Sequence, residues 1–79
     1  MEKAEHMTSL RRIDPDRNMA RYYSVWLQQD LFGRICVFRS WGRFGTNGRT
    51  KVESFDSIEP AIALRERVER RKKRRGYSS

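Results

Sequence analysis

A glycine-rich segment at residues 41–49, with the sequence WGRFGTNGR, constrains the fold of this chain most. It separates two runs rich in β-branched and aromatic residues, 35–41 and 50–55, by the length of a hairpin loop. Asn47 and Gly48 favour a type I′ turn, because that turn needs positive φ at both central residues. The two flanking runs are therefore predicted to be antiparallel strands.

The same segment carries side chains that suit a ligand. Trp41 stands where the turn begins, so its amphipathic ring can be half buried and half offered to a partner. Arg43 and Arg49 add planar, permanently charged groups that match phosphate or carboxylate. Gly42 lets the backbone bend or admits a close neighbour. The segment is predicted to be a binding loop, with two alternatives open: Trp41 as a core residue, and Arg43 bound to turn carbonyls or to Asp30.

The chain is short and basic. Its 79 residues allow one small domain, and its net charge of +8 with a pI near 10.6 attracts nucleic acid, an anionic membrane surface or an acidic protein. Residues 1–20 carry no net charge, whereas residues 21–49 and 50–79 each carry +4. The positive charge therefore accompanies the glycine-rich segment and the C-terminal third.

Cys36 is the single cysteine and His6 the single histidine. One cysteine excludes an internal disulfide and indicates a reducing compartment, and we expect Cys36 to be a small core residue. One cysteine and one histidine are too few ligands for a protein metal site. We expect no metal and no cofactor. No apolar run is long enough to span a membrane or to resemble a signal peptide. We expect a soluble, cytoplasmic monomer without a membrane partner.

Alternation of apolar residues predicts four strands. They cover residues 7–13, 21–28, 35–41 and 50–55, after a flexible tail at residues 1–6. Tyr23, Val25 and Leu27 share one face of the second strand, while the opposite face, which includes Trp26, is mixed. The third strand is predicted to be central, with both faces at least partly covered.

A helix is predicted over residues 57–75. Ser57 is a suitable N-cap, and Gly76 with Tyr77 suits a Schellman-type cap at the other end. The apolar stripe consists of Ile58, Ala61, Ile62, Leu64 and Val68. The predicted fold class is α+β: an antiparallel meander of about four strands with the helix packed on one face. A single domain is expected over residues 7–77, followed by a tail at 78–79.

The helix ends in six consecutive cations, residues 70–75. The helix dipole stabilises cations at a C-terminus, so a solvated helix end explains part of the run, and a nuclear-localisation signal would have the same composition. Six successive cations exceed what the dipole favours, because neighbouring like charges repel. We therefore predict that Arg71, Lys73 and Arg75 contact phosphates.

No catalytic constellation can be assembled from this sequence. It offers no Ser-His-Asp set, no paired carboxylates beside a glycine loop and no metal ligands. The Gly42–Gly45 spacing matches neither standard phosphate loop. A binding module, rather than an enzyme, is therefore the expected class.

The chain resembles the WGR domain family. The matching features, in chain order, are Arg21-Tyr22-Tyr23, Leu31-Phe32-Gly33, Arg39, Trp41-Gly42-Arg43-Phe44-Gly45-Thr46, Gly48, Phe55, Ala61 and Gly76-Tyr77. They span nearly the whole sequence. The resemblance implies an antiparallel sheet with one helix packed across it, which agrees with the fold predicted from the residues.

The resemblance also implies a function. The family accompanies the catalytic domain of DNA-dependent poly(ADP-ribose) polymerases and occurs in short bacterial proteins. In the polymerases the motif tryptophan packs on a sugar near a DNA strand end, which implicates Trp41, and the motif arginine connects DNA to neighbouring domains, which implicates Arg43. Lys51 is a looser candidate for a phosphate contact.

The resulting hypothesis is a non-catalytic module that binds DNA in preference to RNA, with a preference for strand ends. The candidate contacts are Trp41, Gly42, Arg43, Arg49, Lys51, Arg71, Lys73 and Arg75. The alternative is a protein-interaction domain that uses the surface around Trp41.

Overall fold

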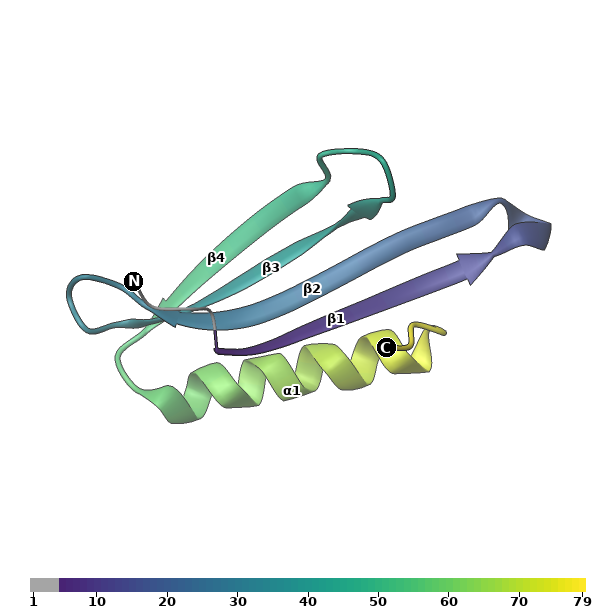
Figure 1. Cartoon of the computed structure of the whole chain (residues 1–79). Coiled ribbons are helices and arrows are strands. Elements are labelled where there is room, and N and C mark those ends of the chain that lie inside the picture. The colour runs from purple at the N-terminus through teal and green to yellow at the C-terminus, as the bar shows by residue number, and fades with distance from the viewer. Residues whose placement is uncertain (1–4) are drawn as a thin grey trace.

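The computed structural model describes residues 5–79 as one four-stranded antiparallel sheet with a helix across one face (Figure 1). The elements are β1 (Glu5–Asp14), a 3-10 turn η1 (Pro15–Arg17), β2 (Met19–Gln29), β3 (Ile35–Arg43), β4 (Arg49–Phe55) and α1 (Ile58–Arg74). The strands lie in the order β1-β2-β3-β4, so each pairs with its neighbour in sequence. The predicted α+β meander is confirmed.

The strand register divides the sheet into two faces. The helix-side face carries Thr8, Leu10, Arg12, Asp14, Met19, Arg21, Tyr23, Val25, Leu27, Gln29, Ile35, Val37, Arg39, Trp41, Arg43, Arg49, Lys51, Glu53 and Phe55. The open face carries Ser9, Arg11, Ile13, Ala20, Tyr22, Ser24, Trp26, Gln28, Cys36, Phe38, Ser40, Gly42, Thr50, Val52 and Ser54. Within the described chain no helix covers the open face (Figure 1). The third strand was predicted to have both faces at least partly covered; the helix covers one face, and on the other Cys36 is buried while Phe38 and Ser40 are half-buried.

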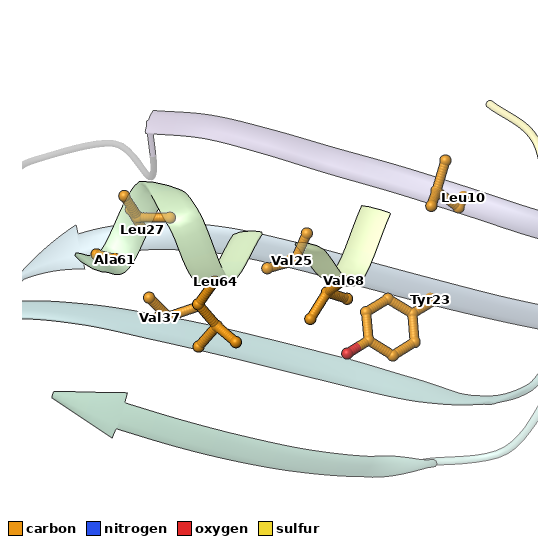
Figure 2. Packing of buried hydrophobic residues seen from close by; sticks show 8 residues of the cluster. All are labelled: Leu10, Tyr23, Val25, Leu27, Val37, Ala61, Leu64 and Val68. Carbon is orange, nitrogen blue, oxygen red and sulfur yellow. The ribbon is translucent and has the colours of Figure 1, made fainter. Parts of the chain in front are cut away.

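The core lies between the helix and the sheet. Its buried residues are Leu10, Tyr23, Val25, Leu27, Val37, Ala61, Leu64 and Val68 (Figure 2). Three of them, Ala61, Leu64 and Val68, recur at i, i+3 and i+7 and form the buried stripe of α1. Ile58, also predicted in the stripe, is the first residue of the helix and stays 41% exposed.

The N-terminal end of the helix differs from the prediction, whereas the C-terminal end agrees with it. Ser57 occupies the N-cap position, but its side chain makes no capping hydrogen bond. At the C-terminus Gly76 has φ +96°, and its N–H bonds to the Lys73 carbonyl while the Tyr77 N–H bonds to the Lys72 carbonyl, each at 3.1 Å. This is the predicted Schellman-type cap.

The expected tails also differ. Residues 1–4 lie outside the described chain, but residues 5 and 6 belong to β1. Ser78 pairs with Arg11 through two backbone hydrogen bonds of 2.8 and 2.9 Å, which tie the segment after the helix to the edge strand β1.

The β3–β4 turn is not the predicted type I′ turn at Asn47-Gly48. Among the described residues outside glycine only Asn18 has positive φ, so Asn47 does not fit that turn. The positive angles fall at Gly45 and Gly48, +87° and +66°. The chain reverses instead at residues 43–46, where the N–H and hydroxyl of Thr46 donate to the Arg43 carbonyl at 3.1 and 2.7 Å.

Candidate nucleic-acid interface

Gly42 and Gly48 allow the backbones of β3 and β4 to approach closely where the hairpin loop begins and ends. A Cβ on Gly42 would lie 2.7 Å from the Cα of Gly48, closer than real Cβ atoms approach. A Cβ on Gly48 would lie 2.1 Å from the Tyr22 hydroxyl and 2.4 Å from the Trp41 carbonyl oxygen. Gly42, which the sequence suggested as a ligand contact, therefore has a packing role: it lets the two strands meet directly behind Trp41.

The helix-side face is hollowed where the C-terminal half of α1 passes over β2, β3 and β4. We call this cavity of about 360 Å³ the basic hollow; its lining residues are Tyr23, Arg39, Trp41, Lys51, Val68, Arg71 and Lys72. Strand alternation places Arg39 beside Trp41 on β3, and the register places Lys51 opposite Arg39 on β4. Helical spacing brings Arg71 and Lys72 to the same side as Val68. Four cations and an indole ring thus share one depression.

Lys72 lies against aromatic rings in this hollow. Its Nζ is 4.7 Å from the centroid of the Tyr23 ring and 5.3 Å from that of Tyr77. The Tyr23 ring in turn stacks on Trp41, with centroids 6.0 Å apart and planes 17° from parallel. Burial lowers the pKa of Lys72, and the nearby cations Arg75 and Arg71 lower it further. An anion that entered the hollow would offset the repulsion between Lys72 and these neighbouring cations.

Arg39 is held by a carboxylate from the neighbouring strand. Its guanidinium pairs with Glu53, whose Oε1 also lies 3.9 Å from Lys51 Nζ. The Nε of Arg39 is buried and has no hydrogen-bond partner within residues 5–79. Burial raises the pKa of Tyr23, although the charge of Arg39 acts in the opposite direction. Glu53 offsets only part of the positive charge and leaves a donor on Arg39 unsatisfied.

Arg43 has a structural partner. Its Nη1 donates to the Asn18 carbonyl at 3.0 Å and its Nη2 approaches Asn18 Oδ1 at 3.4 Å, so it ties β3 to the β1–β2 turn. Asp30, the pairing alternative, accepts hydrogen bonds from the backbone N–H groups of Phe32 and Arg34. The guanidinium remains exposed and available for a second contact.

The structure gathers some of the predicted contacts and separates others. Trp41, Lys51 and Arg71 line the hollow, and Arg49 lies next to it, opposite Trp41 in the register. Lys73 and Arg75 are exposed and do not line it. Lys73 and Arg75 therefore lie near the end of α1, on the surface outside the basic hollow.

Sequence reasoning missed Arg39, Lys72 and Tyr23 as site residues. Period-two alternation from Trp41 could have found Arg39, and the spacing of four from Val68 could have found Lys72. Tyr23 was expected to share a face with Val25 and Leu27, as it does, but no role in a site was predicted for it.

Other kinds of site find little support in the described chain. Across residues 5–79 no three His, Cys, Asp or Glu side chains are grouped so as to hold a metal ion. In the same part of the chain, no helix combines the length and apolarity needed to cross a membrane.

The comparison with known families decides the classification. A family model described as the WGR domain matches residues 6–79. The chain belongs to the WGR domain family. The matched region is a module rather than a catalytic domain.

Relatives of this WGR domain include proteins of different size. It is 48% identical over 66 residues to the uncharacterized protein y4dW of Sinorhizobium fredii, covering 84% of this chain and 32% of that one. It is 48% identical over 50 residues to poly [ADP-ribose] polymerase of Drosophila melanogaster, covering 61% of this chain and 5% of the polymerase. The chain thus spans a minor part of either relative. No solved structure matches it significantly.

Proposed function

We propose that this WGR domain is a non-catalytic module that binds nucleic acid through the basic hollow, DNA in preference to RNA. The observation that carries the proposal is the juxtaposition of Trp41 with the cations Arg39, Lys51, Arg71 and Lys72 in one depression. The single buried cysteine supports a reducing compartment, and we place the protein in the cytoplasm.

The parts of a nucleotide match the parts of the hollow. Phosphate oxygens pair with Lys and Arg, and this term dominates affinity for nucleic acid. An indole ring packs on the face of a sugar or base and adds about 1–3 kcal/mol per nucleotide. Trp41 forms one wall and Lys51, Arg71 and Lys72 surround it, so a sugar and its phosphates can be held together.

A ring set among cations in a depression also favours strand ends. In the interior of a duplex the sugar faces are covered by the continuous backbone, whereas at an end or nick stacking is interrupted and a terminal sugar can be reached. We expect Arg43, which is exposed two residues beyond Trp41 on β3 and bonded to Asn18, to donate a charged hydrogen bond to the same strand. Trp41 and Lys51, which the family resemblance implicates, both line the hollow, and this supports the proposal.

The test compares DNA with and without ends. We expect linear or nicked duplex to bind more tightly than covalently closed circular DNA of the same sequence, by about 1–3 kcal/mol. Trp41→Ala is expected to abolish this difference and to leave the salt-dependent background, because the cations remain. A duplex RNA of the same sequence tests the preference for DNA. Equal affinity of the folded wild type for circles and ends would refute the strand-end preference.

A protein partner at the Trp41 surface is the competing function. Four cations around Trp41 would require that partner to be acidic. Stoichiometric co-purification with one protein, unaffected by nuclease, together with no measurable affinity for any DNA, would replace the nucleic-acid proposal.

A further inference from the structure

The open face differs from the rest of the molecule in its charge. Charged residues make up 35% of the sequence, yet among the described strand residues of this face only Arg11 is charged. It lies at the edge, on β1. A nearly neutral sheet face is unusual in a chain with net charge +8 and calls for an explanation.

An apolar row crosses this face. Trp26, Phe38 and Val52 lie directly opposite one another on β2, β3 and β4. The rings of Trp26 and Phe38 stack with centroids 5.2 Å apart and planes 4° from parallel, and Val52 is 48% exposed. The solvated face of an antiparallel sheet normally carries polar side chains, so an apolar row there indicates a contact surface.

A row of hydroxyl groups runs beside the apolar row. Ser9, Ser24, Ser40 and Thr50 occupy opposite positions across all four strands. The hydroxyls of Thr50 and Ser40 are within hydrogen-bond distance, 3.4 Å. Side chains this short keep the face flat and can donate or accept hydrogen bonds with an identical row.

We propose that the open face binds the open face of a second copy of this chain. A two-fold axis parallel to the central strands lays β2 of one copy over β3 of the other. Trp26 then faces Phe38 of the second copy, and the hydroxyls of Ser24 and Ser40 face each other. Such an interface is isologous, since each row meets its own counterpart, and it matches the aligned packing of two β-sheets. This proposal differs from the monomer expected from the sequence.

Charge selects this mode of association. Two copies that approach through their helix-side faces would bring together Arg12, Arg21, Arg39, Arg43, Arg49 and Lys51 of each, with the cations of α1. Approach through the open faces puts those surfaces on the outside. The open face has few cations, and this argues against its binding a single strand of nucleic acid. Proteins that stack bases on aromatic rings normally bind the phosphates with cations beside those rings.

The size of the face sets the expected affinity. Strands of 7 to 11 residues, about 3.3 Å per residue and about 4.8 Å apart, give a face of roughly 500–700 Å². A standard interface buries about 800 Å² on each partner, so this one falls at the small end. We expect a dissociation constant in the micromolar range, roughly 1–100 µM.

Sedimentation velocity over a wide concentration series tests the dimer, with a matched pair of charge variants. Val52→Lys puts a cation into the interface and is expected to raise the dissociation constant about tenfold or more. Ala63→Lys adds the same charge on the exposed outer side of α1 and is expected to leave it unchanged. A wild type that stays monomeric up to about 1 mM, or equal effects of both variants, would overturn the proposal.

The two tryptophans give a readout on the wild type alone, which does not depend on the folding of any variant. In NMR spectra the Trp26 indole N–H is expected to shift as protein concentration rises, while that of Trp41 stays constant. Addition of DNA is expected to shift Trp41, so the two proposals can fail separately. If oligonucleotide shifts Trp26 and concentration does not, the open face binds nucleic acid and the dimer is refuted.

Discussion

The two faces of the sheet share the same strands but differ in chemistry. The helix-side face carries six cations, Arg12, Arg21, Arg39, Arg43, Arg49 and Lys51, whereas the open face carries Arg11. Because side chains alternate along a strand, neighbouring residues such as Arg39 and Ser40 belong to opposite faces. Net charge alone therefore says little about where a basic protein binds a polyanion; the phase of the alternation decides it.

The largest expected effect comes from weakening the packing of α1 on the helix-side face, because the helix covers this face alone. Leu64 is 6% exposed and packs α1 onto the sheet. Leu64→Ala is expected to lower the free energy of unfolding by about 2–5 kcal/mol, through lost burial and the cavity left behind. Chemical denaturation measures the change. Ile58→Ala, at the exposed start of the same helix, is the control; equal losses in both variants would remove Leu64 from the core.

The next largest effect is on DNA binding, and it distinguishes the cations that line the hollow from those outside it. Lys51→Gln with Arg71→Gln is expected to reduce the slope of log affinity against log salt by about 1.8, and duplex affinity at 0.1 M salt by roughly fiftyfold. Lys73→Gln with Arg74→Gln removes the same charge outside the hollow and is expected to change the slope less. Fluorescence titrations at several salt concentrations give both slopes. Identical slopes would mean that only total charge matters.

The smallest effect is a pH dependence from Lys72. Its pKa is lowered by burial, so between its folded value and the ordinary 10.5 the unfolded chain binds more protons, and stability gained from this group rises with pH. Lys72→Met removes this term, so its stability relative to wild type is expected to fall as pH rises through that window. Tyr23, whose pKa is raised, acts oppositely above pH 10 in both proteins. Denaturation midpoints across the series measure the difference, and a constant offset would contradict it.

The sequence predicted the helix and strands better than it predicted which residues line the hollow. Alternation identified the strands, and the cap at Gly76-Tyr77 followed from local chemistry. The turn was wrongly assigned to Asn47-Gly48. Gly45 and Gly48 both accept positive φ, and the sequence does not show which of them lies in the turn unless the strand register is known.

Long-range geometry explains the residues that were missed. Whether Lys72 reaches Tyr23 depends on where the helix crosses the sheet, which no local pattern encodes. Lys73 and Arg75 look equivalent to Arg71 in the sequence, yet only Arg71 reaches the hollow. The uncovered Trp26–Phe38 stack escaped notice because a mixed face resembles a covered one until the helix is placed.

The contact between Gly42 and Gly48 limits how this hairpin can change during evolution. A Cβ on Gly42 would meet the backbone of Gly48, and a Cβ on Gly48 would meet the carbonyl oxygen of Trp41. Because these obstacles are backbone atoms, a smaller side chain elsewhere does not remove them. We therefore expect the shape of the hairpin, rather than any ligand, to require glycine at the centre of the tryptophan-glycine-arginine motif.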